Sequence, residues 1–353
     1  EDAGKTKLDH GLRLVDFNRC GVPLVEMVTE PDLRSADEAA QYLVQLRQLL
    51  RWIGVSEADM ERGHLRCDAN VSIRERGSQV LNTKTEIKNV NSIDAVRQAI
   101  IEESKRQIEL VESGGKVVSY TLDWDADTGK LTMMRSKETE ADYRYFREPD
   151  LLPVVLSEEE IARFKAELPE FPLERRARFE TEYGLSAYDA DILTSERGLS
   201  EYFENAVAGF VGEAKVVSNW MMNDLSRLMN DLAKTASELV LTPKFLAQII
   251  GMVEEGKINA ATGKSLLRKV EESGREPARI VEEEGLAVIA DSGALRQQIE
   301  SVLAASPAEV ESFRAGKESL LGWFVGQVMR ATGGKADPKR TREILLDLLG
   351  QKS

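Results

Sequence analysis

The feature that most constrains the fold is a change of sequence pattern at Pro153. Before it, alternating apolar residues typical of strands are mixed with segments of helical periodicity. After it, helical segments follow one another, separated by short breakers such as Thr242-Pro243 and Gly256-Lys257. Because 353 residues are too many for a single hydrophobic core, we expect two or three domains. The predicted fold class is α+β, with an all-helical second part.

Local signals place the individual elements. A capping box of Ser35 and Glu38 predicts a helix that Gly54 ends, and a second helix should run from Ser92 to Gly114-Gly115. Strand patterns occupy residues 65–74, 82–89, 117–122 and 130–135, and the last two flank a turn sequence that predicts a β-hairpin. Thr242 with Pro243 is a standard helix start. The expected domains are 1–165, 166–292 and 293–353, the last with three short helices.

Acidic residues in the first seventy positions are the strongest chemical signal. Asp68 and Asn70 alternate with apolar residues, which puts both on one strand face, where burial would require a metal, a phosphate or hydrogen bonds. Glu26 lies within 21–28, an apolar run that otherwise predicts a buried strand. Glu1 opens the chain. Carboxylates of this kind suggest a site for Mg²⁺ and nucleotide phosphates.

Two further stretches carry charge. Lys84, Glu86 and Lys88 alternate along one predicted strand face, as a row that could bind phosphate or line a polar passage, or could be an exposed, salt-bridged strand. The segment Asp142–Asp150 is dense in aromatic and charged residues. It could dock a nucleotide or a partner protein, or form an interdomain hinge. The residues alone leave both pairs of alternatives open.

The net charge of −14 argues against a general nucleic-acid coat protein. The segment Arg314–Ser353 is the exception, with eight basic and four acidic residues. Such a tail could contact RNA, although a solvated helical face would look similar. The segment therefore permits a local RNA contact on an otherwise acidic protein.

Several classes of protein and site are disfavoured. Cys20 and Cys67 are too few for a disulfide framework, and no apolar run approaches membrane-spanning length, so the expected location is the cytoplasm and no membrane contact is predicted. There is no Walker-type glycine loop, so phosphoryl chemistry would depend on a metal and basic side chains. Because the chain opens at Glu1 rather than Met, we also expect an upstream segment.

Five ordered motifs resemble one known family, GatB, the B subunit of the tRNA-dependent amidotransferase. They are Glu1–Lys5, Pro23–Glu26, Arg66–Ser72, Glu86–Ser92 and Tyr143–Phe146. The resemblance continues through the tail, where Phe324–Met329 and Gly334–Pro338 look like the family's YqeY-like domain. It covers essentially the whole chain.

The resemblance implies a fold and an activity. The fold would be a mixed-sheet cradle domain, a helical domain and a small YqeY-like tail. The activity would be phosphorylation, with ATP and Mg²⁺, of the side-chain carboxylate of Glu-tRNA(Gln) or Asp-tRNA(Asn), followed by amidation with ammonia. In the implied heterotrimer, the A subunit would be the glutaminase that releases this ammonia, and the C subunit would tie the other two together. Misacylated tRNA would contact the helical and tail regions.

The resemblance also implies roles for single residues. Glu1, Glu26 and Asp68 would hold Mg²⁺. Lys84 and Lys88, with Asn89, would lie along the phosphate cradle or ammonia route. Glu86 is the better candidate for a proton relay, because a protonated lysine cannot accept a proton from ammonium.

Two departures and one alternative accompany these roles. The family's opening strand and its cysteine zinc segment lie upstream of Glu1, so this chain alone is expected to be catalytically incomplete. Arg147 replaces the usual proline after Tyr143–Phe146, so the local turn could differ.

The alternative function is a noncatalytic tRNA-docking or scaffold protein. Retention of Glu26, Asp68 and Lys88 weighs against it.

Overall fold

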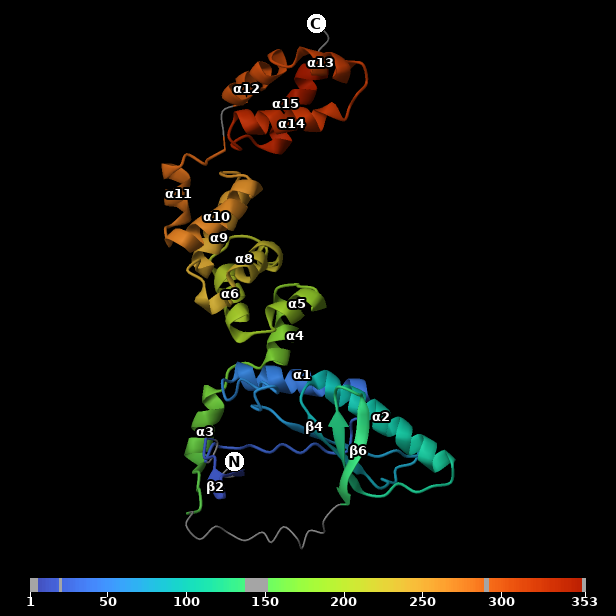
Figure 1. The fold of residues 1–353 in the computed structure, drawn as a ribbon. Coiled ribbons are helices and arrows are strands. Elements are labelled where there is room, and N and C mark those ends of the chain that lie inside the picture. The colour runs from blue at the N-terminus through green and yellow to red at the C-terminus, as the bar shows by residue number, and fades with distance from the viewer. Residues whose placement is uncertain (1–5, 19–20, 137–151, 289–291, 351–353) are drawn as a thin grey trace. The chain divides into compact units, whose positions relative to one another are not determined.

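The computed structural model describes residues 6–18, 21–136, 152–288 and 292–350 (Figure 1). The chain forms two compact units. The first comprises Glu1–Arg47 and Glu57–Leu152, and the second comprises Gln48–Ser56 and Pro153–Ser353. Mixed strands and helices in the first unit and helices in the second confirm the predicted α+β class.

The described residues of the first unit form two sheets. A two-stranded antiparallel sheet joins β1 and β2, and a four-stranded sheet has the order β3-β4-β5-β6. In the larger sheet β4 and β5 are parallel and the outer pairs are antiparallel, because α2 carries the chain from β4 back to the start of β5. The elements are β1 (Thr6–Asp9), β2 (Leu12–Val15), α1 (Ala36–Trp52), β3 (Cys67–Val71), β4 (Thr85–Val90), α2 (Ile93–Glu112), β5 (Tyr120–Asp125) and β6 (Lys130–Ser136).

Local sequence signals account for the two long helices of this part of the chain. The Ser35 hydroxyl accepts a hydrogen bond from the amide of Glu38, and the Ser92 hydroxyl caps α2 by accepting from the amide of Ala95. Beyond the end of α2, Gly114 has a φ of +83°, which glycine adopts without strain. Both predicted helices are therefore confirmed. The hairpin of β5 and β6 is confirmed as well.

Helix α2 packs against one face of the four-stranded sheet. The core there combines apolar residues of β3, β4, β5, α1 and α2, including Ile87, Val96 and Trp124. Buried apolar surface of this kind contributes about 25 cal/mol per Å². Because strand residues alternate between faces, the other face of the sheet carries the polar side chains. That second face holds the candidate site.

A buried polar network fixes α2 to the sheet. The Glu103 carboxylate is fully buried and accepts hydrogen bonds from Thr85 Oγ1, Gln107 Nε2 and Arg106 Nη2, each at 2.7 Å. Gln107 Nε2 also donates to the Val71 carbonyl at 3.0 Å. Burial raises the pKa of Glu103, but the hydrogen bonds from Arg106, Gln107 and Thr85 outweigh it and the net pKa is lowered. The network joins α2 to β3 through Val71 and to β4 through Thr85 and is structural.

The apolar run around Glu26 does not form the predicted buried strand. Residues 21–30 have neither helical nor strand structure, and all of them are exposed. Val25 and Val28 expose 76% and 85% of their surfaces. The prediction was wrong because hydrophobicity alone does not supply a pairing strand: in the described residues, β1 pairs with β2 and the larger sheet begins at β3.

The second unit is helical throughout its described residues. Its larger core includes Phe179, Phe203, Met221 and Ile250, all nearly or fully buried. The helices of this part of the chain are α3 (Glu158–Glu167), α4 (Pro172–Glu182), α5 (Ala187–Leu193), α6 (Arg197–Ala208), α7 (Ala214–Trp220), the π-helical η2 (Met221–Leu225), α8 (Ser226–Leu232), the 3₁₀ turn η3 (Ala236–Glu238), α9 (Pro243–Glu254), α10 (Ala260–Ser273) and α11 (Pro277–Glu283). The predicted start at Thr242-Pro243 is confirmed, since Thr242 caps α9.

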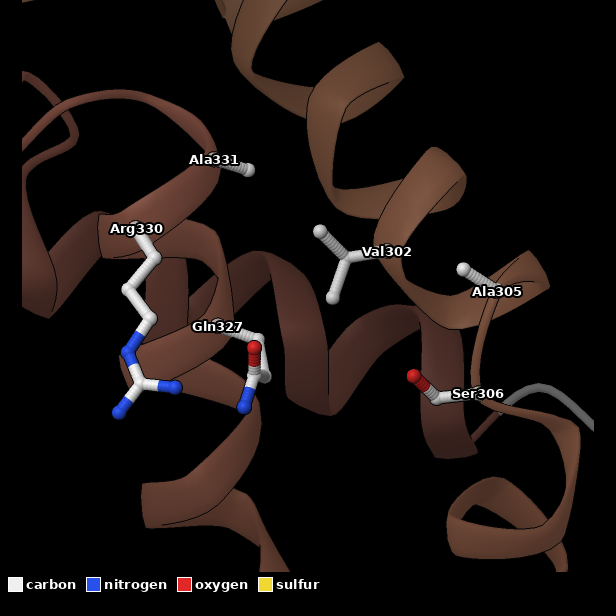
Figure 2. Close-up of a pocket in the computed structure, with 6 residues that line it drawn as sticks. All are labelled: Val302, Ala305, Ser306, Gln327, Arg330 and Ala331. Atoms are coloured by element: carbon white, nitrogen blue, oxygen red, sulfur yellow. The ribbon is translucent and has the colours of Figure 1, made fainter.

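The last part of the chain has its own small core, which includes Leu295, Phe324 and Leu345. Its described residues form four helices rather than the predicted three, because Pro307 starts a separate short helix after the turn at Ser306. A hollow of about 380 Å³ between α12 and α14 is lined by Val302, Ala305, Ser306, Gln327, Arg330 and Ala331 (Figure 2). The helices are α12 (Ser292–Ala304), α13 (Pro307–Arg314), α14 (Leu320–Ala331) and α15 (Pro338–Gly350).

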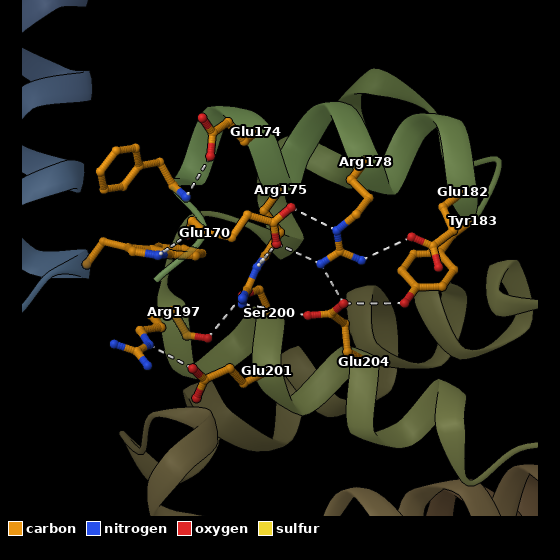
Figure 3. A network of polar contacts seen from close by, with 12 residues as sticks. Glu170, Glu174, Arg175, Arg178, Glu182, Tyr183, Arg197, Ser200, Glu201 and Glu204 are labelled. Carbon is orange, nitrogen blue, oxygen red and sulfur yellow. Dashed lines mark hydrogen bonds and ion pairs between the residues drawn. The ribbon is translucent and has the colours of Figure 1, made fainter. Parts of the chain in front are cut away.

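A charged cluster, the Arg178 cluster, consists of Glu170, Arg175, Arg178 and Glu204 (Figure 3). Arg178 donates to both oxygens of Glu170 at 2.8 Å and lies 2.7 Å from Glu204 Oε1. Arg175 bonds to Glu170 at 3.0 Å. The end of α1 contacts this cluster, because the indole N–H of Trp52 donates a hydrogen bond to the backbone carbonyl of Glu170.

Among the helices described, none has both the length and the apolar character needed to span a bilayer.

Candidate functional site

The candidate site lies on the face of the four-stranded sheet opposite α2. In β4, Thr85 and Ile87 are fully buried, whereas Glu86 and Lys88 alternate with them and point to the other face. Asn70 of β3 pairs with Glu86, and Thr121 of β5 pairs with Glu86 from the opposite side. Pairing between strands therefore brings polar residues from three separate segments together.

A β-bulge occurs where β3 meets β4. Cys67 pairs with Val90 and Ala69 pairs with Ile87, so Asp68 alone faces two residues of β4, Lys88 and Asn89. Asn89 has a φ of +61°, the left-handed conformation that asparagine tolerates better than most residues. The bulge places the side chain of Lys88 beside that of Asp68.

Four side chains form the strand-face cluster: Asp68, Glu86, Lys88 and Thr121. Lys88 Nζ lies 3.1 Å from Asp68 Oδ2 and 3.9 Å from Glu86 Oε1. Glu86 Oε2 accepts a hydrogen bond from Thr121 Oγ1 at 3.3 Å. The side chains of Asp68 and Lys88 are 46% and 37% exposed, whereas that of Glu86 is 19% exposed. The cluster is therefore held by the sheet on one side and accessible to solvent on the other.

Two residues of β5 contribute that sequence reasoning did not identify. Thr121 contacts Glu86, and Asp123 accepts a hydrogen bond from Asn89 Nδ2 at 2.5 Å. Polar residues at alternate positions of β5 are visible in the sequence and indicate a polar strand face. The parallel pairing of β4 with β5, which brings them to this site, was not predictable from either segment alone.

The other predicted site residues lie outside the strands that form this cluster, or outside the described residues. Lys84 precedes β4 and is exposed, so the expected row of three on one strand is reduced to Glu86 and Lys88. Glu26 lies in the exposed segment 21–30. Glu1 and the segment 142–150 lie outside the described residues.

The fit of these residues to Mg²⁺ is incomplete. Carboxylate oxygens are the ligands that Mg²⁺ prefers, and Asp68 and Glu86 supply them on one accessible face. However, the ammonium of Lys88 lies between these two carboxylates. Within the described ranges, no three Asp, Glu, His or Cys side chains gather closely enough to hold a metal ion. The described residues therefore do not form a metal site by themselves.

Cys67 is a poor candidate nucleophile. Burial, and next the negative charge of Asp68, raise the pKa of its thiol to about 11. A thiol with such a pKa is protonated near neutral pH and is a poor nucleophile. The reactive groups of this face are its carboxylates and its lysine.

Comparison with known families decides the relationship. Residues 1–162 match the GatB/GatE catalytic domain, and residues 201–349 match the family described as the GatB domain. The chain belongs to the GatB family. All members of the strand-face cluster lie within the GatB/GatE catalytic-domain match. The resemblance inferred from the sequence motifs is confirmed.

Individual GatB relatives agree over nearly the whole chain. The B subunit of the aspartyl/glutamyl-tRNA(Asn/Gln) amidotransferase of Thermodesulfovibrio yellowstonii is 48% identical over 350 residues, which is 99% of this chain and 74% of the relative. Proteins of the same name from Moorella thermoacetica and Myxococcus xanthus are 47% and 46% identical, again over 99% of this chain and over 74% and 73% of their own lengths. The chain thus spans about three-quarters of these relatives.

Proposed function

We propose that this chain is the component of a glutamine-dependent tRNA amidotransferase that activates the side-chain carboxylate of a misacylated tRNA, using ATP. The supporting observation is the strand-face cluster: two carboxylates flank an ammonium on an accessible sheet face within the catalytic-domain match. The names of the relatives support Glu-tRNA(Gln) and Asp-tRNA(Asn) as the substrate class.

The chemistry requires two steps, because a carboxylate has no adequate leaving group for ammonia. In the first, a side-chain carboxylate oxygen attacks the γ-phosphorus of ATP, and the bond to the bridging oxygen breaks to release ADP. In the second, ammonia attacks the acyl carbon, the bond to the phosphate oxygen breaks, and phosphate leaves. The nitrogen loses a proton to a base. Both steps concentrate negative charge that the protein must offset.

The cluster offers a role for each charged member. The ammonium of Lys88 is a fixed positive charge that would stabilise the phosphoryl oxygens. Asp68, 3.1 Å away, fixes the position of that ammonium. Glu86, which is mostly buried and hydrogen-bonded to Thr121, would accept the proton that ammonia loses. Lys84 and Asn89 are proposed to act beside this cluster along the phosphate or ammonia path.

We propose Mg²⁺ as the accompanying metal ion, with Glu1, Glu26 and Asp68 as ligands suggested by the sequence resemblance. Bound Mg²⁺ would lower the repulsion between two anionic reactants. The described residues alone do not form its site.

The proposed partners follow from the same assignment. The glutaminase, which is the A subunit, would supply ammonia; the C subunit would join the glutaminase to this chain; and the assembly would act in the cytoplasm. The tRNA is proposed to contact the helical and tail regions of the second unit. The basic residues of the tail support this contact, among them Arg330 beside the hollow between α12 and α14 (Figure 2).

The direct test is the ATP hydrolysis that depends on Glu-tRNA, measured with the full-length protein together with the A and C subunits. Replacing Asp68 by alanine should lower this rate by about 100-fold, because Lys88 loses its nearer partner. Binding of tRNA should remain unchanged. Asp127→Ala, in the exposed turn of the β5–β6 hairpin, is the matched control and should keep the wild-type rate.

Two results would contradict the proposal. An unchanged rate in Asp68→Ala would remove the strand-face cluster from the reaction. ATP hydrolysis that never depends on Glu-tRNA, together with intact tRNA binding, would favour the noncatalytic scaffold instead.

A further inference from the structure

Asn89 and Asp123 form a brace at the edge of the strand-face cluster. We infer that they are positioning residues, which hold the β-bulge of β4 and thereby set where the Lys88 ammonium lies. This inference rests on the proposed function, because it assigns these two residues a part in the same reaction. It gives Asn89 an indirect role in place of direct contact with a ligand.

The bulge interrupts the regular alternation of side chains between the two faces of β4. Ile87 and Val90 both belong to the buried core, although they are three positions apart and a regular strand would point them to opposite faces. One extra residue restores the pattern, and that residue is Asn89, which is exposed. Lys88 can therefore stay on the polar face while Val90 returns to the core.

The backbone of Asn89 makes the extra residue possible. Its φ of +61° is a conformation in which most side chains are strained, while glycine and asparagine are tolerated. An alanine here would favour a different backbone angle and would push the bulge out of register. Because Lys88 is the other residue of the bulge, its side chain would move with it.

The side chain of Asn89 ties the bulge to the neighbouring strand. Asn89 Nδ2 donates to Asp123 Oδ1 at 2.5 Å, and Asp123 is in register with Lys88 across the β4–β5 pair. On the other edge of β4, Lys88 is paired with Asp68 of β3. The bulge is thus braced on both sides, by Asp123 from β5 and by Asp68 from β3.

The test measures Lys88 directly, without relying on turnover. Reductive methylation of the assembled complex with formaldehyde, followed by mass spectrometry, reports how readily each lysine amine reacts. An amine that is ion-paired on two sides by carboxylates is shielded from the reagent and reacts slowly. Asn89→Ala should raise the Lys88 methylation rate by about threefold or more, because the amine would leave its place between Asp68 and Glu86. Lys84, exposed and outside the strand, is the internal reference and should not change.

A set of milder variants separates the backbone from the side-chain contribution. Asn89→Gly keeps the backbone conformation and removes the hydrogen bond, and Asp123→Ala removes the same bond from the other side. Each should raise the Lys88 rate less than Asn89→Ala does. The double variant N89G/D123A should raise the methylation rate of Lys88 no more than either single variant does, because the two changes remove one shared interaction. Asp123→Asn keeps an acceptor oxygen for Asn89, so the methylation rate of Lys88 should stay at its wild-type value.

Turnover then separates this inference from the proposed function. Asn89→Ala should lower Glu-tRNA-dependent ATP hydrolysis by about tenfold at saturating tRNA, with the KM for tRNA unchanged. Unchanged Lys88 methylation in Asn89→Ala, or additive effects of N89G and D123A, would overturn the positioning role. Faster methylation with wild-type turnover would uphold the positioning of Lys88 and contradict the proposed reaction at this face.

Discussion

The strand-face cluster and the Arg178 cluster contain the same kinds of side chain but are built differently. In the Arg178 cluster each carboxylate accepts bonds from an arginine, and the arginine side chains are at most 31% exposed (Figure 3). In the strand-face cluster, one lysine serves two carboxylates and both Asp68 and Lys88 are more than one-third exposed. The difference separates a closed network that holds helices together from an open one that can still engage a ligand.

The geometry of the arginines explains why the first network is closed. A guanidinium presents several donors in a fixed plane, so Arg178 can satisfy Glu170, Glu182 and Glu204 at once. The hydrogen bond from Arg178 is the largest influence on Glu170 and helps hold the pKa of that carboxyl below its usual value. Little bonding capacity is left for a substrate.

The largest effect on stability is expected from opening the Arg178 cluster. Arg178→Met should lower the free energy of unfolding by about 2 kcal/mol, because Glu170 and Glu204 would lose charged donors while partly buried; the loss is less than for a fully buried pair because solvent screens it. Urea unfolding of the second unit measures this change. Lys88→Met should change the unfolding free energy by at most about 0.5 kcal/mol.

Arg163→Met is the matched control for that experiment. Arg163 pairs with Glu167 on α3 at 3.9 Å and its side chain is 60% exposed, so about 0.5 kcal/mol or less is expected. If Arg178→Met and Lys88→Met lowered the free energy of unfolding equally, the proposed difference between the closed and the open cluster would be wrong.

A smaller, pH-dependent effect is expected at Glu103, in the buried polar network of the first unit. Glu103→Gln should cost about 1 to 2 kcal/mol at pH 7, because charge-assisted hydrogen bonds from Arg106 are lost. The net pKa of Glu103 is lowered on folding, so the carboxylate stabilises the fold above its ordinary pKa of 4.5. That contribution is lost as the pH falls through the folded-state pKa.

The measurement is urea unfolding of the wild type and Glu103→Gln at a series of pH values from 7 down to 3. The difference between the two unfolding free energies should shrink below about pH 4.5. A difference that stays constant over this range would mean that the Glu103 charge does not stabilise α2 against the sheet.

Much of the fold could be predicted because its signals are local. Ser92 and Gly114 mark the ends of α2, and Thr242 with Pro243 marks the start of α9. Alternation placed Asp68 and Asn70 on one exposed face of β3. Each of these signals depends on neighbours within a few residues, so it can be identified from a single sequence.

What could not be predicted depends on pairing between distant segments. Whether 21–28 was a buried strand depended on a partner strand, which its hydrophobicity does not reveal. Thr121 reaches Glu86 only because β5 runs parallel to β4. The bulge at Asn89 depends on the register between β3 and β4. The roles of Glu1, Glu26 and the metal ion stay predictions.

The most direct measurement follows the side-chain oxygen of the tRNA-bound amino acid. Glu-tRNA carrying ¹⁸O in its side-chain carboxylate would be converted in a single turnover by the complete complex with ATP and glutamine. If the carboxylate attacks ATP, one ¹⁸O should appear in inorganic phosphate for each amide formed, and Asp68→Ala should slow this transfer together with amide formation. Amide formation with unlabelled phosphate would contradict the account.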